Sequence, residues 1–179
     1  MERTPTTELW LIRHATAEPR RADLADVERD LTDAGVREAE ALSGGLPPFD
    51  HLYVSPARRA RRTAEAIAHL APAGSEPLEA LWDGEGTDLP DVLARMLRVG
   101  PSASASGVTT GARPLRVGVV GHAPMLAEAA GLLIAPYRAD QPARLHLAKA
   151  GVAQLLGTLE PGGMELRLLI GPDDAARFA

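Results

Sequence analysis

Cysteine and asparagine are both absent from the 179-residue sequence, and lysine occurs only at Lys149. Without cysteine the chain has no disulfide, no thiol nucleophile and no sulfur ligand for a metal, which is typical of cytoplasmic proteins. The sequence contains no run of about 18 apolar residues, so no membrane-spanning helix is expected. It also lacks a basic-then-apolar leader, and we therefore expect a cytoplasmic location.

Aromatic residues make up only 3 % of the chain, so its core must be built from Leu, Val, Ala and Ile. The length and the ordinary share of apolar residues, 45 %, predict one globular domain over residues 1–179. The formal net charge of −5 does not favour binding of the domain to nucleic acid, which is itself negatively charged. Because nearly every cation is an arginine, an arginine is informative only where it occupies a defined position in a motif.

Strand-like and helix-like patterns alternate along the chain, which predicts βαβ units around a mainly parallel sheet. Strands are expected at 8–12, 51–54, 116–120, 151–158 and 165–170, and helices starting at Thr32, Ser55, about Pro90 and near Pro124. The turn Pro161-Gly162-Gly163 predicts a hairpin between the last two strands. We expect a single three-layer α/β/α domain, with a flexible loop over the low-complexity residues 100–114.

Two of the expected helices carry signals at their N-termini. Thr32 is suited to be an N-cap, with Leu31 and Val36 in the two staple positions. In the second helix Ser55 is the expected N-cap, followed by a first-turn proline at Pro56.

Three expected strands end in residues suited to phosphate chemistry. The first strand ends in Arg13-His14, the strand 116–120 leads into His122, and the strand 51–54 leads into an arginine-rich helix. In open α/β sheets, ligands bind beyond the carboxyl ends of the strands. The sequence therefore predicts that two histidines and several arginines form one phosphate site.

The arginine-rich helix breaks a local rule. Its first two turns, where the helix dipole is already positive, carry Arg58, Arg59, Arg61 and Arg62. A bound anion would resolve this conflict, because free N–H groups at a helix N-terminus bind phosphate and arginine adds a bidentate fork. The alternative is a solvated arginine face, which we favour for Arg58 and Arg61 and consider as strong as phosphate binding for Arg62.

The two strand-end histidines predict phosphoryl transfer through imidazole. A neutral imidazole with one nitrogen fixed by a backbone acceptor leaves its other nitrogen free as a nucleophile. A second histidine, when protonated, would neutralise charge on the phosphoryl oxygens. Metal binding by His14 and His122 is the weaker reading, since no carboxylate follows a comparable strand and the arginines would repel a cation. We expect neither a metal nor another cofactor.

Four ordered segments carry a family resemblance: Leu11–Ala17, Arg29–Gly35, Ser55–Glu65 and Val120–Leu126. Together they resemble the histidine phosphatase superfamily, also called phosphoglycerate mutase-like, and most of all its short SixA-type phosphohistidine phosphatase branch without a cap domain. The resemblance implies that His14 is phosphorylated transiently. It also implies that Arg13, Arg59 and His122 form the phosphate pocket.

Further residues are expected to bind the substrate. Arg29 matches an arginine of the branch's early motif, and Ser55 and Arg62 complete the expected substrate-binding set. The histidines His51, His69 and His146 are expected to have structural or surface roles.

The proton donor is the main departure from the family pattern. Larger relatives carry a proton-donating glutamate after the third strand, and the matching position here is Ala80. Candidate replacements nearby are Glu79, Asp83 and Glu85, although each fits a plain surface carboxylate as well. An alkoxide leaving group needs an acid, whereas a protonated phosphohistidine leaves as neutral imidazole without one.

We therefore expect a metal-independent phosphatase that acts on phosphohistidine of a partner protein through His14. The first alternative is the same chemistry on a small phosphorylated metabolite. An alternative of a different class is a non-catalytic phosphate-binding regulatory domain, against which the intact set of expected pocket residues argues. The expected partners are a phosphorylated protein or metabolite, and neither nucleic acid nor membrane.

Overall fold

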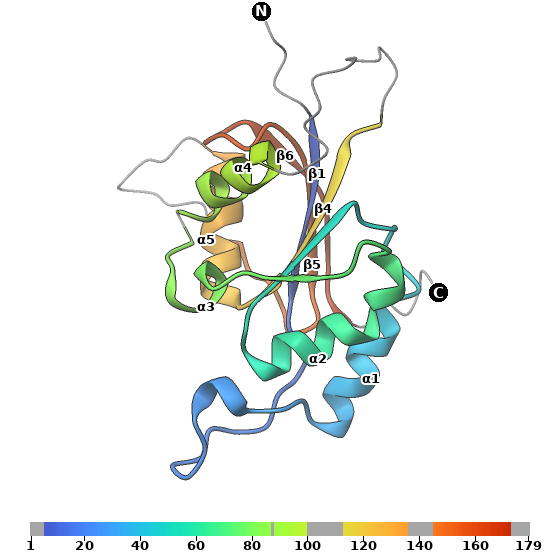
Figure 1. The fold of residues 1–179 in the computed structure, drawn as a ribbon, viewed down its shortest axis with the longest axis vertical. Helices are drawn as coiled ribbons and strands as arrows, with labels where there is room; N and C mark the ends of the chain where they lie inside the picture. Colours follow the sequence, from blue (N-terminus) through green and yellow to red (C-terminus); the bar gives the residue numbers. More distant parts are fainter. Residues whose placement is uncertain (1–5, 87, 100–112, 136–144, 173–179) are drawn as a thin grey trace, which may run out of the picture.

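A computed structural model describes residues 6–86, 88–99, 113–135 and 145–172, and it places helices on both faces of one six-stranded sheet (Figure 1). The strands are β1 (Thr7–Arg13), β2 (His51–Val54), β3 (Glu76–Pro77), β4 (Leu115–Gly121), β5 (Val152–Gly157) and β6 (Met164–Ile170). The α-helices are α1 (Asp33–Leu42), α2 (Arg58–Ala66), α3 (Ala80–Asp83), α4 (Leu89–Val99) and α5 (Ala123–Ile134). Two 3₁₀ turns are η1 (Asp26–Glu28) and η2 (Ala68–Leu70). Of the expected loop at 100–114, residues 100–112 lie outside the described residues.

The sheet has the strand order β3-β2-β4-β1-β5-β6. Strands β1 to β4 run parallel to one another, as expected, whereas β5 is antiparallel to both β1 and β6. The sheet is therefore mixed. Its parallel part contains the three strands whose ends were expected to carry the site, and these are neighbours in the order β2-β4-β1.

Strand β1 is covered by helices on both faces of the sheet. Leu9 and Leu11 pack in one apolar cluster with α4 and α5, while Trp10 and Ile12 pack in a second cluster with α1 and α2. Because alternate side chains point to opposite faces, a continuous apolar run indicates a strand covered by helices on both sides. Among the described helices, none is both long and apolar enough to cross a bilayer.

Of the two predicted N-caps, Thr32 is confirmed and Ser55 is wrong. Thr32 caps α1, and its hydroxyl accepts a hydrogen bond from the Gly35 N–H at 3.1 Å. Ser55 does not cap α2, which begins only at Arg58 and has no side-chain cap at Ala57. The Ser55 hydroxyl instead contacts a histidine 67 positions away, a long-range partner that a local capping pattern cannot reveal.

Candidate active site

The register of β1 against β4 brings the two strand-end histidines together. Arg13 lies opposite Gly121, so that His14 and His122 leave the sheet side by side. Their ring centroids are 5.1 Å apart, with the ring planes inclined at 63°. The prediction that both histidines lie at one edge of the sheet is confirmed.

The two rings face a cavity of about 720 Å³ beyond the carboxyl ends of the parallel strands. Of the residues expected in the site, those that line it are Arg13, His14, Arg29, Arg59, Glu85 and His122. They come from β1, the loop after β1, α2, the loop after α3 and the start of α5. This is where parallel α/β sheets bind ligands.

The tautomer of His14 follows from its backbone contact. Nδ1 lies 2.8 Å from the Ala15 carbonyl oxygen and must carry the proton to donate there. Nε2 therefore has a free electron pair, and the Arg59 Nε–H donates to it at 3.3 Å. Burial, with a smaller effect of nearby arginines, lowers the pKa of His14 from 6.5 to about 4, even though the Ala15 bond opposes the shift. In the free protein His14 is a neutral imidazole with a lone pair directed toward a guanidinium.

His122 is held on both sides. One ring nitrogen, Nε2, is 2.9 Å from the Ser55 hydroxyl, and Nδ1 is 3.4 Å from an Arg59 nitrogen. Burial, followed by the charges of His14 and Arg59, lowers the pKa of His122 to about 3. An incoming phosphate dianion would offset these effects and favour protonation of the ring. Ser55 is fully buried and does not line the cavity, so it orients His122 in place of the expected contact with substrate.

The two central arginines supply donors to the same space. Arg59 is 4 % exposed although it carries a charge. In Arg13, Nη1 donates to the Leu147 carbonyl at 2.8 Å, while Nε is buried without a partner, the only such side-chain atom among the described residues. Buried donors in folded proteins are nearly always paired.

The outer arginines divide into two groups. Arg29 lines the cavity and is anchored to the Glu18 carbonyl at 2.6 Å. Arg62 does not reach the cavity, contrary to its expected role in substrate binding. It pairs with Glu65 at 2.7 Å and faces Asp30, on a separate hollow that also holds Arg58 and Arg61. Arg62 therefore belongs to the solvated arginine face.

Known proteins are similar to this chain in sequence pattern and in fold. A sequence profile described as "Histidine phosphatase superfamily (branch 1)" matches residues 9–86. A structure of the protein histidine phosphatase SixA complexed with tungstate superposes with a TM-score of 0.72 at 20 % identity, covering 94 % of this chain and 99 % of that one. A candidate SixA phosphohistidine phosphatase from Nakamurella multipartitia is 28 % identical, with a TM-score of 0.69 and coverages of 94 % and 98 %.

The segment 9–86 is similar to the histidine phosphatase superfamily, and the fold is similar to that of SixA phosphatases. These neighbours support the SixA-type branch and a phosphatase activity. A mycobacterial glucosyl-3-phosphoglycerate phosphatase has a similar fold, with a TM-score of 0.69 at 17 % identity and coverages of 91 % and 98 %. No curated protein sequence matches the chain.

An aspartate that the sequence did not single out organises the arginines. The Asp26 carboxylate bonds Arg59 at 3.0 Å, Arg29 at 2.9 Å and Arg20 at 3.0 Å. Burial acts to raise the pKa of Asp26, but the arginines outweigh it and hold that pKa below its ordinary value. Asp26 is therefore an unsuitable proton donor, and a bound phosphate would share its guanidinium groups.

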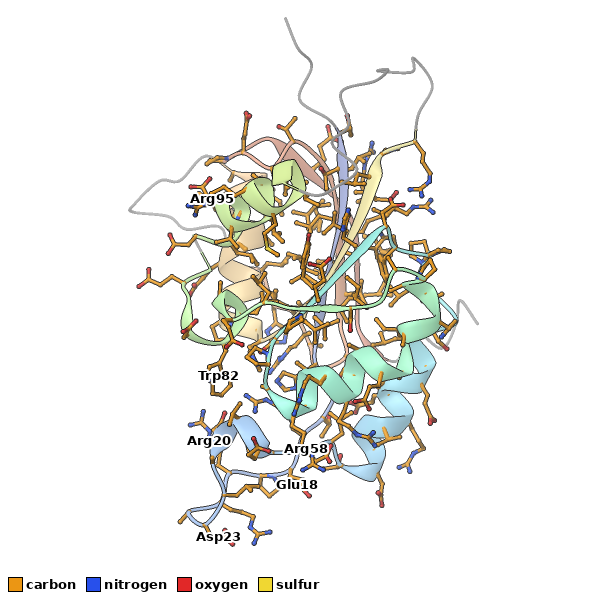
Figure 2. The ribbon with its side chains drawn as sticks, viewed as in Figure 1. Glu18, Arg20, Asp23, Arg58, Trp82 and Arg95 are labelled. Carbon is orange, nitrogen blue, oxygen red and sulfur yellow. The ribbon has the colours of Figure 1, made fainter. Side chains whose placement is uncertain are left out.

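The expected proton donors lie on and beside the short helix α3: Glu79 precedes it, Asp83 is its last residue and Glu85 follows it. Glu79 and Asp83 are exposed and do not line the cavity, whereas Glu85 does. Glu128 of α5 lines it as well, although no sequence pattern indicated it. Trp82 of α3 also lines the cavity and, as Figure 2 shows, extends toward the loop that carries Arg20.

We expect the neutral state of His14 to persist to low pH. With its pKa lowered to about 4, the ring signal in an NMR titration should change with a midpoint near 4, and His14→Ala identifies that signal. Between pH 6.5 and about 4 the unfolded chain binds a proton that the folded chain does not, so the free energy of unfolding should fall as the pH falls through this window. A midpoint near the ordinary value of 6.5 would contradict the burial of a neutral ring.

Proposed function

We propose that this phosphatase is metal-independent and hydrolyses phosphohistidine on a partner protein through a phosphorylated His14. One observation carries the proposal. Nδ1 of His14 is fixed by the Ala15 carbonyl, so the lone pair lies on Nε2, which accepts a hydrogen bond from Arg59 in a cavity also lined by Arg13 and His122. An activated nucleophile surrounded by anion-binding donors is the arrangement that covalent phosphoryl transfer requires.

In the first step, Nε2 of His14 attacks phosphorus and forms a P–N bond while the bond to the leaving nitrogen breaks. A substrate imidazole that is protonated on its distal nitrogen takes the bonding electron pair and departs as neutral histidine. Arg13 and Arg59 donate hydrogen bonds to the phosphoryl oxygens throughout the transfer. No proton has to come from the enzyme.

In the second step, water attacks the phosphorylated His14. The new P–O bond replaces the P–Nε2 bond, the electron pair returns to Nε2, and the water proton passes to the departing phosphate or to solvent. The sum of both steps is phosphohistidine plus water giving histidine plus inorganic phosphate. His14 returns to the neutral form fixed by Ala15.

Preference for a nitrogen leaving group rests on the position after β3. Ala80 packs partly buried against the core and carries no acid, and the flanking Glu79 is exposed and lies away from the cavity. The absence of an acid at position 80 should not slow hydrolysis of a substrate whose leaving group needs no proton.

Two carboxylates support a second candidate, a phosphatase of a small phosphorylated metabolite. Glu85 and Glu128 both line the cavity. Gly86 allows the loop that carries Glu85 to pack closely against α5, because a Cβ atom at this position would collide with the Met125 carbonyl and with Glu128. Either carboxyl group, when protonated, could supply a proton to an alkoxide.

The two candidates are separated by turnover of a phosphohistidine-bearing protein domain and of a sugar phosphate, each with and without EDTA. We expect the phosphohistidine domain to be hydrolysed with a kcat/KM at least 10²-fold higher, since the missing acid penalises only the alkoxide. EDTA should change neither rate. Faster hydrolysis of the sugar phosphate would favour the metabolite, and loss of activity in EDTA would rule out a metal-independent reaction.

A further inference from the structure

A partly exposed tryptophan stands at the phosphate pocket, and neither the proposed covalent chemistry nor the phosphate contacts use it. Trp82 is 37 % exposed and is one of three exposed large apolar residues in the described chain, with Leu166 and Leu169. The two leucines lie on β6, away from the cavity lining. An isolated exposed apolar side chain needs no explanation, whereas one that lines a reactive pocket does.

The indole contacts two of the phosphate-binding side chains. The Arg59 guanidinium carbon lies 5.4 Å from the ring centroid, within cation–π range, and the His122 ring centroid is 5.4 Å away at an angle of 68°. A phosphoryl group held by Arg59 and His122 therefore lies beside the indole. The group attached to phosphorus can therefore lie against it.

A second hollow adjoins the tryptophan and offers space for the group attached to phosphorus. Trp82 lines a second hollow of about 330 Å³, whose other walls are Arg20, Arg21, Leu24, Asp26 and Arg29. Its two apolar walls are Trp82 and Leu24, and its remaining walls are charged. Trp82 also lines the cavity that holds His14, so the two hollows share this side chain. A substrate with its phosphoryl group at His14 has room there for a planar ring.

We propose that Trp82 is a specificity-determining residue that selects phosphorylated compounds whose leaving group is a flat ring, in particular the imidazole of phosphohistidine. The inference rests on the proposed function and names what distinguishes its substrate. Stacking of two rings, together with the attraction of a protonated imidazole to the indole face, is expected to give up to about tenfold selectivity.

The turnover experiment compares two P–N substrates in wild type, Trp82→Leu and Trp82→Phe. One is a phosphohistidine peptide and the other is phosphoramidate, which has the same type of bond and no ring. We expect the ratio of their kcat/KM values to fall about tenfold in Trp82→Leu and to be largely restored in Trp82→Phe. The matched control is Leu166→Ala, equally exposed at 38 % but remote from the cavity, which should keep the wild-type ratio.

A binding experiment keeps the inference separate from catalysis. Calorimetry on wild type and Trp82→Leu compares phenylphosphonate with methylphosphonate, which differ by the ring alone. We expect the phenyl compound to bind wild type about tenfold more tightly and Trp82→Leu with little preference. Equal affinities in wild type would overturn the inference, as would equal losses for both compounds in Trp82→Leu, because Trp82 would then only support Arg59.

Failure of the proposed function has its own signature. If wild type hydrolyses neither P–N substrate but still prefers phenylphosphonate, ring selection stands and the assignment of phosphohistidine as substrate falls. If both P–N substrates are hydrolysed and their ratio is the same in all variants, the proposed function stands and ring selection is wrong.

Discussion

Alanine at position 14 should abolish transfer of labelled phosphate from substrate to the protein and lower turnover by roughly 10³-fold or more, because the attacking nitrogen is lost. In wild type the label should be stable in alkali and labile in acid, as expected of a phosphoramidate bond to imidazole. His122→Ala should retain labelling but slow turnover by about 10²-fold, a common cost of removing a group that stabilises developing charge.

The matched control is His69→Ala, since His69 is exposed on η2 and does not line the cavity. Circular dichroism of each variant separates lost chemistry from lost folding, which matters because His14 is 8 % exposed. Acid-stable label, or label that persists in His14→Ala, would exclude the covalent mechanism at His14.

A second large effect is expected across a series of leaving groups. Without a general acid at Ala80, turnover of phosphohistidine should exceed that of alkyl phosphates by about 10²–10⁴-fold, the usual contribution of an acid to a poor leaving group. Aryl phosphates should lie between the two, because a phenolate departs more readily than an alkoxide. The measurement is kcat/KM for the three classes at one pH.

Amide variants identify any carboxylate that replaces the missing acid. Glu85→Gln and Glu128→Gln change groups that line the cavity, whereas Glu79→Gln changes an exposed group outside it and is the control. All three should leave phosphohistidine turnover nearly unchanged. A large loss at Glu85 or Glu128 on alkyl phosphates alone would identify the proton donor for a metabolite. The same loss on every substrate would contradict an acid-free first step.

The sequence was most informative where an apolar run ends in a reactive residue. Arg13, His14 and His122 were found because the runs before them are too short for helices and too apolar for loops, and because parallel strands end at one edge. Arg59 was found from its offset within an arginine cluster, which by itself did not separate it from Arg62. Burial separates them, since the Arg59 side chain is 5 % exposed and that of Arg62 is 47 % exposed.

The remaining features depend on contacts between distant parts of the chain. Asp26 meets Arg59 across 33 positions, and Trp82 lies on a four-residue helix with no periodic pattern of its own. The role of Ser55 was misjudged for the same reason. Its partner His122 lies 67 positions later in the sequence, so no local pattern around Ser55 indicates the contact. Short helices and loops are placed by tertiary packing, which outweighs local preference.

The place of β4 in the sheet has a consequence for biosynthesis. The segments that carry His14 and Arg59 are both made early, yet β1 and β2 do not pair with each other, because β4 lies between them. A nascent chain that has not yet reached residue 115 lacks β4, so β1 and β2 cannot take their places in the sheet, and it also lacks His122. Domains form their long-range strand pairings late, once the distant partner is available. A chain that ends before residue 115 therefore lacks both the strand between β1 and β2 and the second histidine, and we expect it to be inactive.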